Sequence, residues 1–151
     1  MRHHQSNSKS DFFEMISLHV RDIKTYNSDI FEALLVPEVI ECDYDNRSAT
    51  FEVQVTEKMI NFSGTLYGGV LSSLFDNATG ILMRCYSGRN SSPTIELKVS
   101  FYRPAFIGDI VKIYTEIISI TESFVDLFAI AYISQIKAPL ATASLRFFSK
   151  Q

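Results

Sequence analysis

The chain has few of the residues on which metal sites and redox chemistry depend. Its 151 residues include no tryptophan, two cysteines and three histidines. Cys42 and Cys85 form no CxxC motif, and the histidines are at positions 3, 4 and 19. Because no Cys/His cluster has metal-ligand spacing, we expect no metal site.

The chain also lacks an excess of charge and long apolar runs. The net charge is −3, and no Lys/Arg cluster is interleaved with aromatic residues, so nucleic-acid binding is not expected. Without a run of 18 apolar residues or a signal-peptide core, we expect no stable membrane insertion and a cytoplasmic, reducing location. The first ten residues, MRHHQSNSKS, are basic and hydroxyl-rich without an acid. A mitochondrial or other organellar location therefore stays open, as do a frayed terminus and a cloning remnant.

A single domain of the α+β class is predicted. No repeat or Pro/Gly/Ser linker divides the sequence, and 12 Phe and 7 Tyr supply core volume. Apolar residues at helical spacing predict an N-terminal helical extension at 1–34, with a second short helix capped by Asn27 and Ser28, and residues 35–151 complete the domain. Strands are predicted at residues 39–44, 49–56, 94–103, 110–120, 124–134 and 140–148, with one long helix after the second. Short connections favour an antiparallel sheet with this helix against one face.

The predicted central helix has one acidic residue on a face of small side chains. Its apolar stripe, which should pack on the sheet, consists of Val70, Leu71, Leu74, Phe75, Ala78, Ile81, Leu82 and Cys85. Asp76 points nearly the opposite way, on a second face with Gly69, Ser72, Ser73, Thr79, Gly80 and Met83. Such a face can meet a partner subunit, where partial desolvation would make the carboxylate available for proton transfer. An aspartate that only caps or solubilises the helix is an equal alternative.

Two glycines, Gly68 and Gly69, stand where this helix begins. The free N–H groups and positive dipole end of a helix start can hold an oxygen atom, and glycine has no side chain to block its approach. An oxyanion site is therefore predicted there, although glycines at such a junction can also serve backbone geometry alone.

Residues 61–76, NFSGTLYGGVLSSLFD, resemble a family motif. The pattern N-x-x-G-T-L-x-G-G-x-x-x-x-L-x-D is similar to that of the hotdog-fold acyl-CoA thioesterases of the phenylacetate-pathway and thioesterase-superfamily-member-2 type. The later stretches TIELKVSFYRPAFIGD and LATASLRF resemble strands of the same family, so the likeness spans residues 35–149. It implies a hotdog fold, in which an antiparallel sheet wraps the long helix and two subunits join their sheets.

The resemblance also implies a role for each matched residue, in active sites formed across the dimer interface. The Gly68 amide, with Asn61 nearby, would polarise the thioester carbonyl. Asp76 of the other subunit would act as general base or nucleophile, and Thr94 would help to orient the water. No resident cofactor is implied, because coenzyme A is part of the substrate. The family usually has His-Gly-Gly, so Tyr67 is a departure whose role cannot be carried over.

Further positions are matched to coenzyme A and to the acyl group. Tyr102, Arg103 and Pro104 stand at a strand end where such proteins bind the phosphates or the pantetheine arm, although Arg103 can equally be a surface residue. Thr121 and Ser123 would add to the nucleotide groove. The candidates for an acyl tunnel, each of which can instead be a core residue, are Ile60, Phe62, Leu66, Met83 and Tyr86.

The predicted function is that of an acyl-CoA thioesterase in lipid metabolism, which hydrolyses a fatty or aromatic acyl-CoA to the acid and CoA. A dehydratase of the same fold and a Ser-His-Asp hydrolase both need a histidine, and none lies in residues 35–151, the part of the domain that holds Asp76. A protein that binds acyl-CoA or an acyl chain without hydrolysis stays open. A homodimer is expected because a lone subunit leaves a sheet edge uncovered, and the resemblance implies a dimer of dimers.

Overall fold

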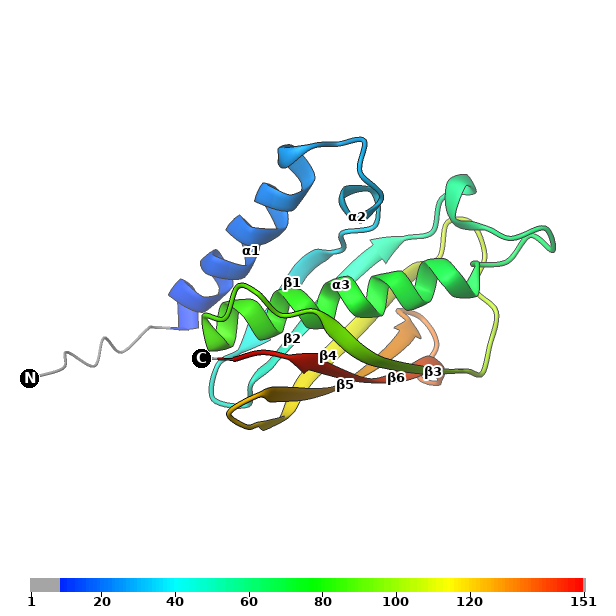
Figure 1. The fold of residues 1–151 in the computed structure, drawn as a ribbon. Coiled ribbons are helices and arrows are strands. Elements are labelled where there is room, and N and C mark those ends of the chain that lie inside the picture. Colours follow the sequence, from blue (N-terminus) through cyan, green and yellow to red (C-terminus); the bar gives the residue numbers. More distant parts are fainter. Residues whose placement is uncertain (1–8, 151) are drawn as a thin grey trace, which may run out of the picture.

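The computed structural model describes residues 9–150, which form a six-stranded antiparallel sheet with a long helix against one face (Figure 1). In chain order the elements are α1 (Lys9–Tyr26), α2 (Phe31–Leu34), β1 (Glu38–Asp43), β2 (Ser48–Gln54), a 3₁₀ turn at Glu57–Met59, α3 (Gly68–Ser87), β3 (Thr94–Phe101), β4 (Ile110–Ile120), β5 (Phe124–Ile133) and β6 (Pro139–Phe148). The strand order is β1-β2-β4-β5-β6-β3, with every neighbour antiparallel. This confirms the predicted α+β architecture.

The strands begin and end within two residues of the predicted positions. The second N-terminal helix is shorter than expected, since α2 is a single turn that follows Ile30 and has no side-chain cap. The predicted capping by Asn27 and Ser28 is wrong. The Asn27 side chain instead accepts a hydrogen bond from the Asp29 N–H at 3.1 Å, which forms a turn that competes with helix.

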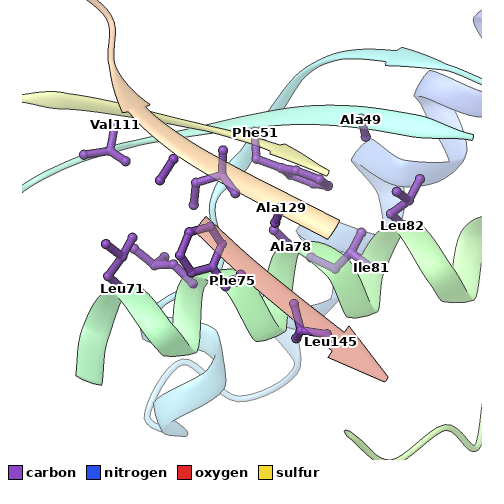
Figure 2. Packing of buried hydrophobic residues seen from close by; sticks show 14 of the residues in the cluster. Ala49, Phe51, Leu71, Phe75, Ala78, Ile81, Leu82, Val111, Ala129 and Leu145 are labelled. Carbon is purple, nitrogen blue, oxygen red and sulfur yellow. The ribbon is translucent and has the colours of Figure 1, made fainter. Parts of the chain in front are cut away.

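The apolar stripe of α3 faces the sheet, as predicted, and Figure 2 shows its side chains directed at those of the strands. Leu74, Phe75, Ala78, Ile81 and Leu82 are fully buried. Burial of each large side chain contributes about 1.5–3 kcal/mol, so this one face holds the long helix in place. Cys85 is only half-buried, but it still packs against the core.

The buried face of α3 is wider than predicted. Thr79, Gly80 and Met83 were expected on the face left for a partner, yet all three are buried. The helical extension explains part of this, since α1 packs on α3 and on β1. The Phe12 ring of α1 contacts Tyr86 of α3 edge-on, with ring centres 6.3 Å apart. The face that stays partly open is therefore confined to the first half of α3.

Within the part of the chain that the structure describes, one edge strand of the sheet is covered by a helix, and the other is not covered by any further strand. At one edge β1 contacts α1, whereas β3 forms the other edge beside β6 with no further strand. In β3, Ile95, Leu97, Val99 and Phe101 alternate with polar residues, but Ile95, Leu97 and Phe101 remain 49%, 41% and 53% exposed. An exposed apolar edge strand is a template for pairing with another chain.

The segment discussed as an organellar presequence lies mostly outside the described residues. Within residues 9–150, no helix is both long and apolar enough to cross a membrane. The division at residue 34 stays a prediction.

Candidate active site

The structure brings together Asp76 and Thr94, which are 18 residues apart in the sequence. Asp76 lies on α3, and Thr94 is the first residue of β3, which runs back alongside the helix (Figure 1). The Thr94 hydroxyl donates a hydrogen bond of 2.6 Å to Asp76 Oδ1. Both side chains are half-buried. A short bond to a carboxylate fixes the acid, while the Thr94 oxygen can still accept a hydrogen bond from a further group such as water.

A pocket of about 350 Å³ surrounds this pair. Its walls come from α2, α3, the α3–β3 loop and Phe147 of β6. Glu32 and Arg84 add one charge of each sign. The pocket is at the small end of the range for ligand sites and contains an acid suited to general-base chemistry.

Arg84 lies between the pocket and the N-terminal helix. The Arg84 guanidinium folds back over Gly80. A Cβ added at Gly80 would lie 3.5 Å from Arg84 Nη1. The neighbouring His19 of α1 has a pKa below its usual value because burial disfavours the charged form and Arg84 repels it. Asp22 and Glu32 oppose this shift, and His19 Nε2 is buried without a hydrogen-bond partner in the described chain.

The Gly68 end of α3 holds the predicted oxyanion donors. Tyr67 is the N-cap, and the first helical hydrogen bond runs from the Leu71 N–H to the Tyr67 oxygen at 3.0 Å. The N–H groups of Gly68 and Gly69 therefore precede the hydrogen-bonded turns of the helix. The Tyr67 ring covers Gly69, because a Cβ added at Gly69 would lie 2.8 Å from the Tyr67 Cε1 atom. The Tyr67 side chain is itself exposed.

Asn61 shapes the loop that leads to this helix start. Its Oδ1 accepts hydrogen bonds from the N–H groups of Ser63 and Thr65 at 2.9 and 3.1 Å, and its Nδ2 donates to Thr65 Oγ1 at 3.0 Å. The Leu66 N–H then donates to the Ala105 oxygen at 2.8 Å. Most of the Asn61 side chain is thus used within its own loop, and its contact with a thioester stays a prediction.

The two halves of the predicted site are far apart within one chain. Gly68 and Asp76 are eight residues apart on one helix, so about 12 Å separates them along its axis. A carbonyl group bound at the Gly68 amide cannot be reached by a water held at Asp76 of the same chain. A single chain therefore brings Thr94 to Asp76 but leaves Gly68 and Asn61 elsewhere.

Tyr102, Arg103 and Pro104 lie at the Gly68 end of the molecule, and all three are exposed. The Tyr102 and Arg103 N–H groups donate to the Leu140 oxygen, and the Tyr102 hydroxyl lies 2.9 Å from Thr142 Oγ1. The Arg103 side chain is thus presented at the end of the edge strand. Its binding of phosphate stays a prediction.

Thr121 and Ser123 lie in the β4–β5 turn. This turn is near the start of β3, whereas Tyr102 follows the end of β3. Thr121 Oγ1 accepts a hydrogen bond from the Phe124 N–H, and the Ser123 oxygen accepts one from the Ser149 N–H. These hydrogen bonds stabilise the turn itself. Within one chain, the structure does not bring Thr121 and Ser123 close to Arg103. Their place in a nucleotide groove stays a prediction.

Sequence reasoning missed Arg89 and Asn77. Arg89 is buried, and its Nη1 donates to the oxygens of Thr121 and Ser149 at 3.2 and 2.6 Å. Asn77 donates to the Leu35 oxygen at 3.1 Å and so ties α2 to α3. An asparagine inside a long helix is a weak helix former, which was the available signal for a tertiary contact.

The acyl-tunnel candidates lie mainly in the core. Leu66 and Met83 are buried, Ile60 and Tyr86 pack against the core, and Phe62 is fully exposed. Among residues 9–150, no group of three or more His, Cys, Asp and Glu side chains could hold a metal ion. Burial raises the pKa of the Cys85 thiol to about 11, which makes it a poor nucleophile.

The family model described as the thioesterase superfamily matches residues 63–144, which are more than half of the chain. The protein therefore belongs to the thioesterase superfamily. A search of the curated proteins finds no match.

Solved structures share the hotdog fold. Thioesterase superfamily member 2 of zebrafish is 15% identical, with a TM-score of 0.81, and the match covers 92% of this chain and 98% of that one. The PaaI protein of the E. coli phenylacetic acid degradation operon is 19% identical, with a TM-score of 0.76 and coverage of 95% and 97%. A hypothetical thioesterase from Streptococcus pneumoniae, solved with coenzyme A, is 16% identical, with a TM-score of 0.64 and coverage of 68% and 80%.

Proposed function

We propose that the protein is an acyl-CoA thioesterase that hydrolyses a fatty or aromatic acyl-CoA. The observation that supports this most directly is the hydrogen bond between Thr94 and Asp76 in a pocket large enough for a small acyl group. Binding alone would not require a fixed carboxylate beside a thioester carbonyl. Membership of the thioesterase superfamily and the coenzyme A bound to the S. pneumoniae relative agree with this class of substrate.

In the proposed reaction, the Gly68 amide donates a hydrogen bond to the thioester carbonyl oxygen. A water molecule held between Asp76 and the Thr94 hydroxyl attacks the carbonyl carbon, and the Asp76 carboxylate accepts the water proton. The amide stabilises the negative charge that develops on the oxygen. When the carbon–sulfur bond breaks, the proton passes to the coenzyme A sulfur, and the free acid leaves.

This reaction needs two copies of the chain, because Gly68 and Asp76 of one chain are too far apart. The exposed edge strand β3 is the surface proposed to join them, since its Leu97 and Phe101 are left uncovered beside unpaired backbone. Antiparallel pairing of two β3 strands would place the Gly68 end of one chain near the Thr94 end of the other. Arg103 and Tyr102 would arrive at the same place and are proposed to bind coenzyme A. The dimer of dimers stays a prediction.

The first test is release of free thiol from short, long and aromatic acyl-CoAs by the wild type and by Asp76→Asn. The variant keeps the size and the Thr94 contact but removes the base, so we expect at least a hundredfold lower kcat with an unchanged oligomeric state. Full activity in Asp76→Asn would reject Asp76 as the base. Thiol release at background in the wild type would reject the thioesterase function.

Binding without hydrolysis is the second candidate, and Tyr67 favours it because it replaces the usual family histidine. Calorimetry with an acyl-CoA distinguishes the two functions. Under this candidate, the wild type binds the ligand and releases no thiol.

A further inference from the structure

The short helix α2 of the N-terminal extension forms one wall of the Asp76 pocket. Phe31 and Glu32 of α2 border the pocket, and Thr94 and Pro93 border it from the α3–β3 side. The extension is therefore in contact with the candidate site, although it precedes the part of the chain that matches the superfamily.

Asn77, the residue after the proposed base Asp76, holds α2 in position. A four-residue helix is not stable alone, so its place depends on tertiary contacts. Asn77 Nδ2 donates to the Leu35 oxygen at 3.1 Å and lies 3.5 Å from the Glu32 oxygen. Leu35 and Val36 anchor the following segment in the core.

Phe31 and Leu34 offer a direct comparison within this one turn. Both are large apolar residues, 64% and 61% exposed, but only Phe31 borders the pocket. An uncovered aromatic ring at a pocket rim gains burial when an apolar ligand group packs against it. The pocket is small, and the charges of Glu32 and Arg84 border it, so a long alkyl chain would desolvate them at a cost.

We propose that Phe31 contacts the acyl group and determines which acyl lengths are accepted, and that Asn77 is the positioning residue for this wall. The inference rests on the proposed thioesterase function and deepens it. α2 limits the pocket to short acyl groups, and the ring of Phe31 closes it toward solvent.

The test is the ratio of kcat/KM for palmitoyl-CoA to that for hexanoyl-CoA, measured on the full chain. Phe31→Ala should raise this ratio about tenfold, because one methylene more or less in an apolar pocket already changes discrimination by about tenfold or more. Leu34→Ala is the matched control and should leave the ratio unchanged. Asn77→Ala should raise the ratio in the same direction, and the double variant should add little, since both changes remove one wall.

Loss of activity that is equal at all chain lengths, or an equal shift in Leu34→Ala, would overturn the inference. If the wild type hydrolyses nothing, the proposed function fails, and the comparison moves to binding of non-hydrolysable hexanoyl and palmitoyl thioether analogues. The Phe31→Ala variant must then change the ratio of the two dissociation constants. An unchanged ratio, or no binding of either analogue by the wild type, would overturn the inference.

Discussion

At the scale of single residues, Gly68 offers a test of one backbone N–H group. Proline is tolerated at the first position of a helix, and Tyr67 before it has φ −66° and ψ 129°, the extended backbone that a following proline requires. Gly68→Pro should therefore fold but lack the proposed oxyanion donor. We expect kcat for thiol release to fall by about 10²–10³.

Gly68→Ala is the matched control, because it keeps the N–H. In both variants the added Cβ lies 3.2 Å from Cζ of the exposed Phe101 ring, which must shift slightly. Circular dichroism and thermal melting check that both variants fold. Equal activity in the two variants would show that this amide does not bind the carbonyl oxygen.

The sequence predicts the individual site residues better than it predicts which of them are in contact. Asp76 stands out because it is the only charged residue between Lys58 and Arg84, and Gly68 because it opens the helix. The bond from Thr94 to Asp76 is set by a loop between α3 and β3, whose course no periodicity describes. The resemblance supplied Thr94, while Asn77 and Arg89 were missed because their partners are backbone oxygens distant in sequence.

At the scale of elements, Arg89 holds the α3–β3 loop that leads to Thr94. Its two bonds join this loop to the β4–β5 turn and to the residue after β6. Arg89→Ala would leave the Thr121 and Ser149 oxygens without this buried partner. We expect the free energy of unfolding in urea to fall by about 2–3 kcal/mol. Arg21→Ala, on the exposed surface of α1, should change it by less than about 0.5 kcal/mol, and a similar effect in both variants would contradict this role.

The contact between α1 and α3 should respond to pH through His19. Burial and Arg84 lower the pKa of His19 in the folded chain, whereas Asp22 and Glu32 only partly oppose them. The unfolded chain therefore binds the proton more strongly, and stability is lost as the pH falls from about 6.5 toward the lower folded value. We expect Tm to drop between pH 7.5 and 5.5, and to drop less in His19→Gln. The same drop in both proteins would assign the pH response to other groups.

For β3, the sequence predicts that a strand forms but not where the strand lies in the sheet. Its alternation of Ile95, Leu97, Val99 and Phe101 with polar residues predicts a strand correctly, because period two is a local property. Which strand forms the sheet edge is a matter of topology, which local pattern does not contain. The exposure of Phe101 thus follows only from the placement of β3 beyond β6.

At the scale of the whole molecule, the candidate residues divide into two groups, one at the start of α3 and one near its middle. Asn61, Gly68 and Tyr102–Pro104 lie at one end, and Asp76 and Thr94 lie farther along the helix. A symmetric dimer through β3 would place the first group of each chain beside the second group of the other. Each complete site would then contain residues of both chains.

This division predicts complementation between two inactive variants. In a mixed dimer of Asp76→Asn and Gly68→Pro, one site has both defects, while the other has an intact Gly68 from one chain and an intact Asp76 from the other. Random assembly makes half of the dimers mixed, so about a quarter of wild-type activity should return after co-refolding. Each variant refolded alone is the control and should stay inactive. If both variants form mixed dimers, shown by affinity tags on the two chains, and no thiol release returns, the site lies within a single chain.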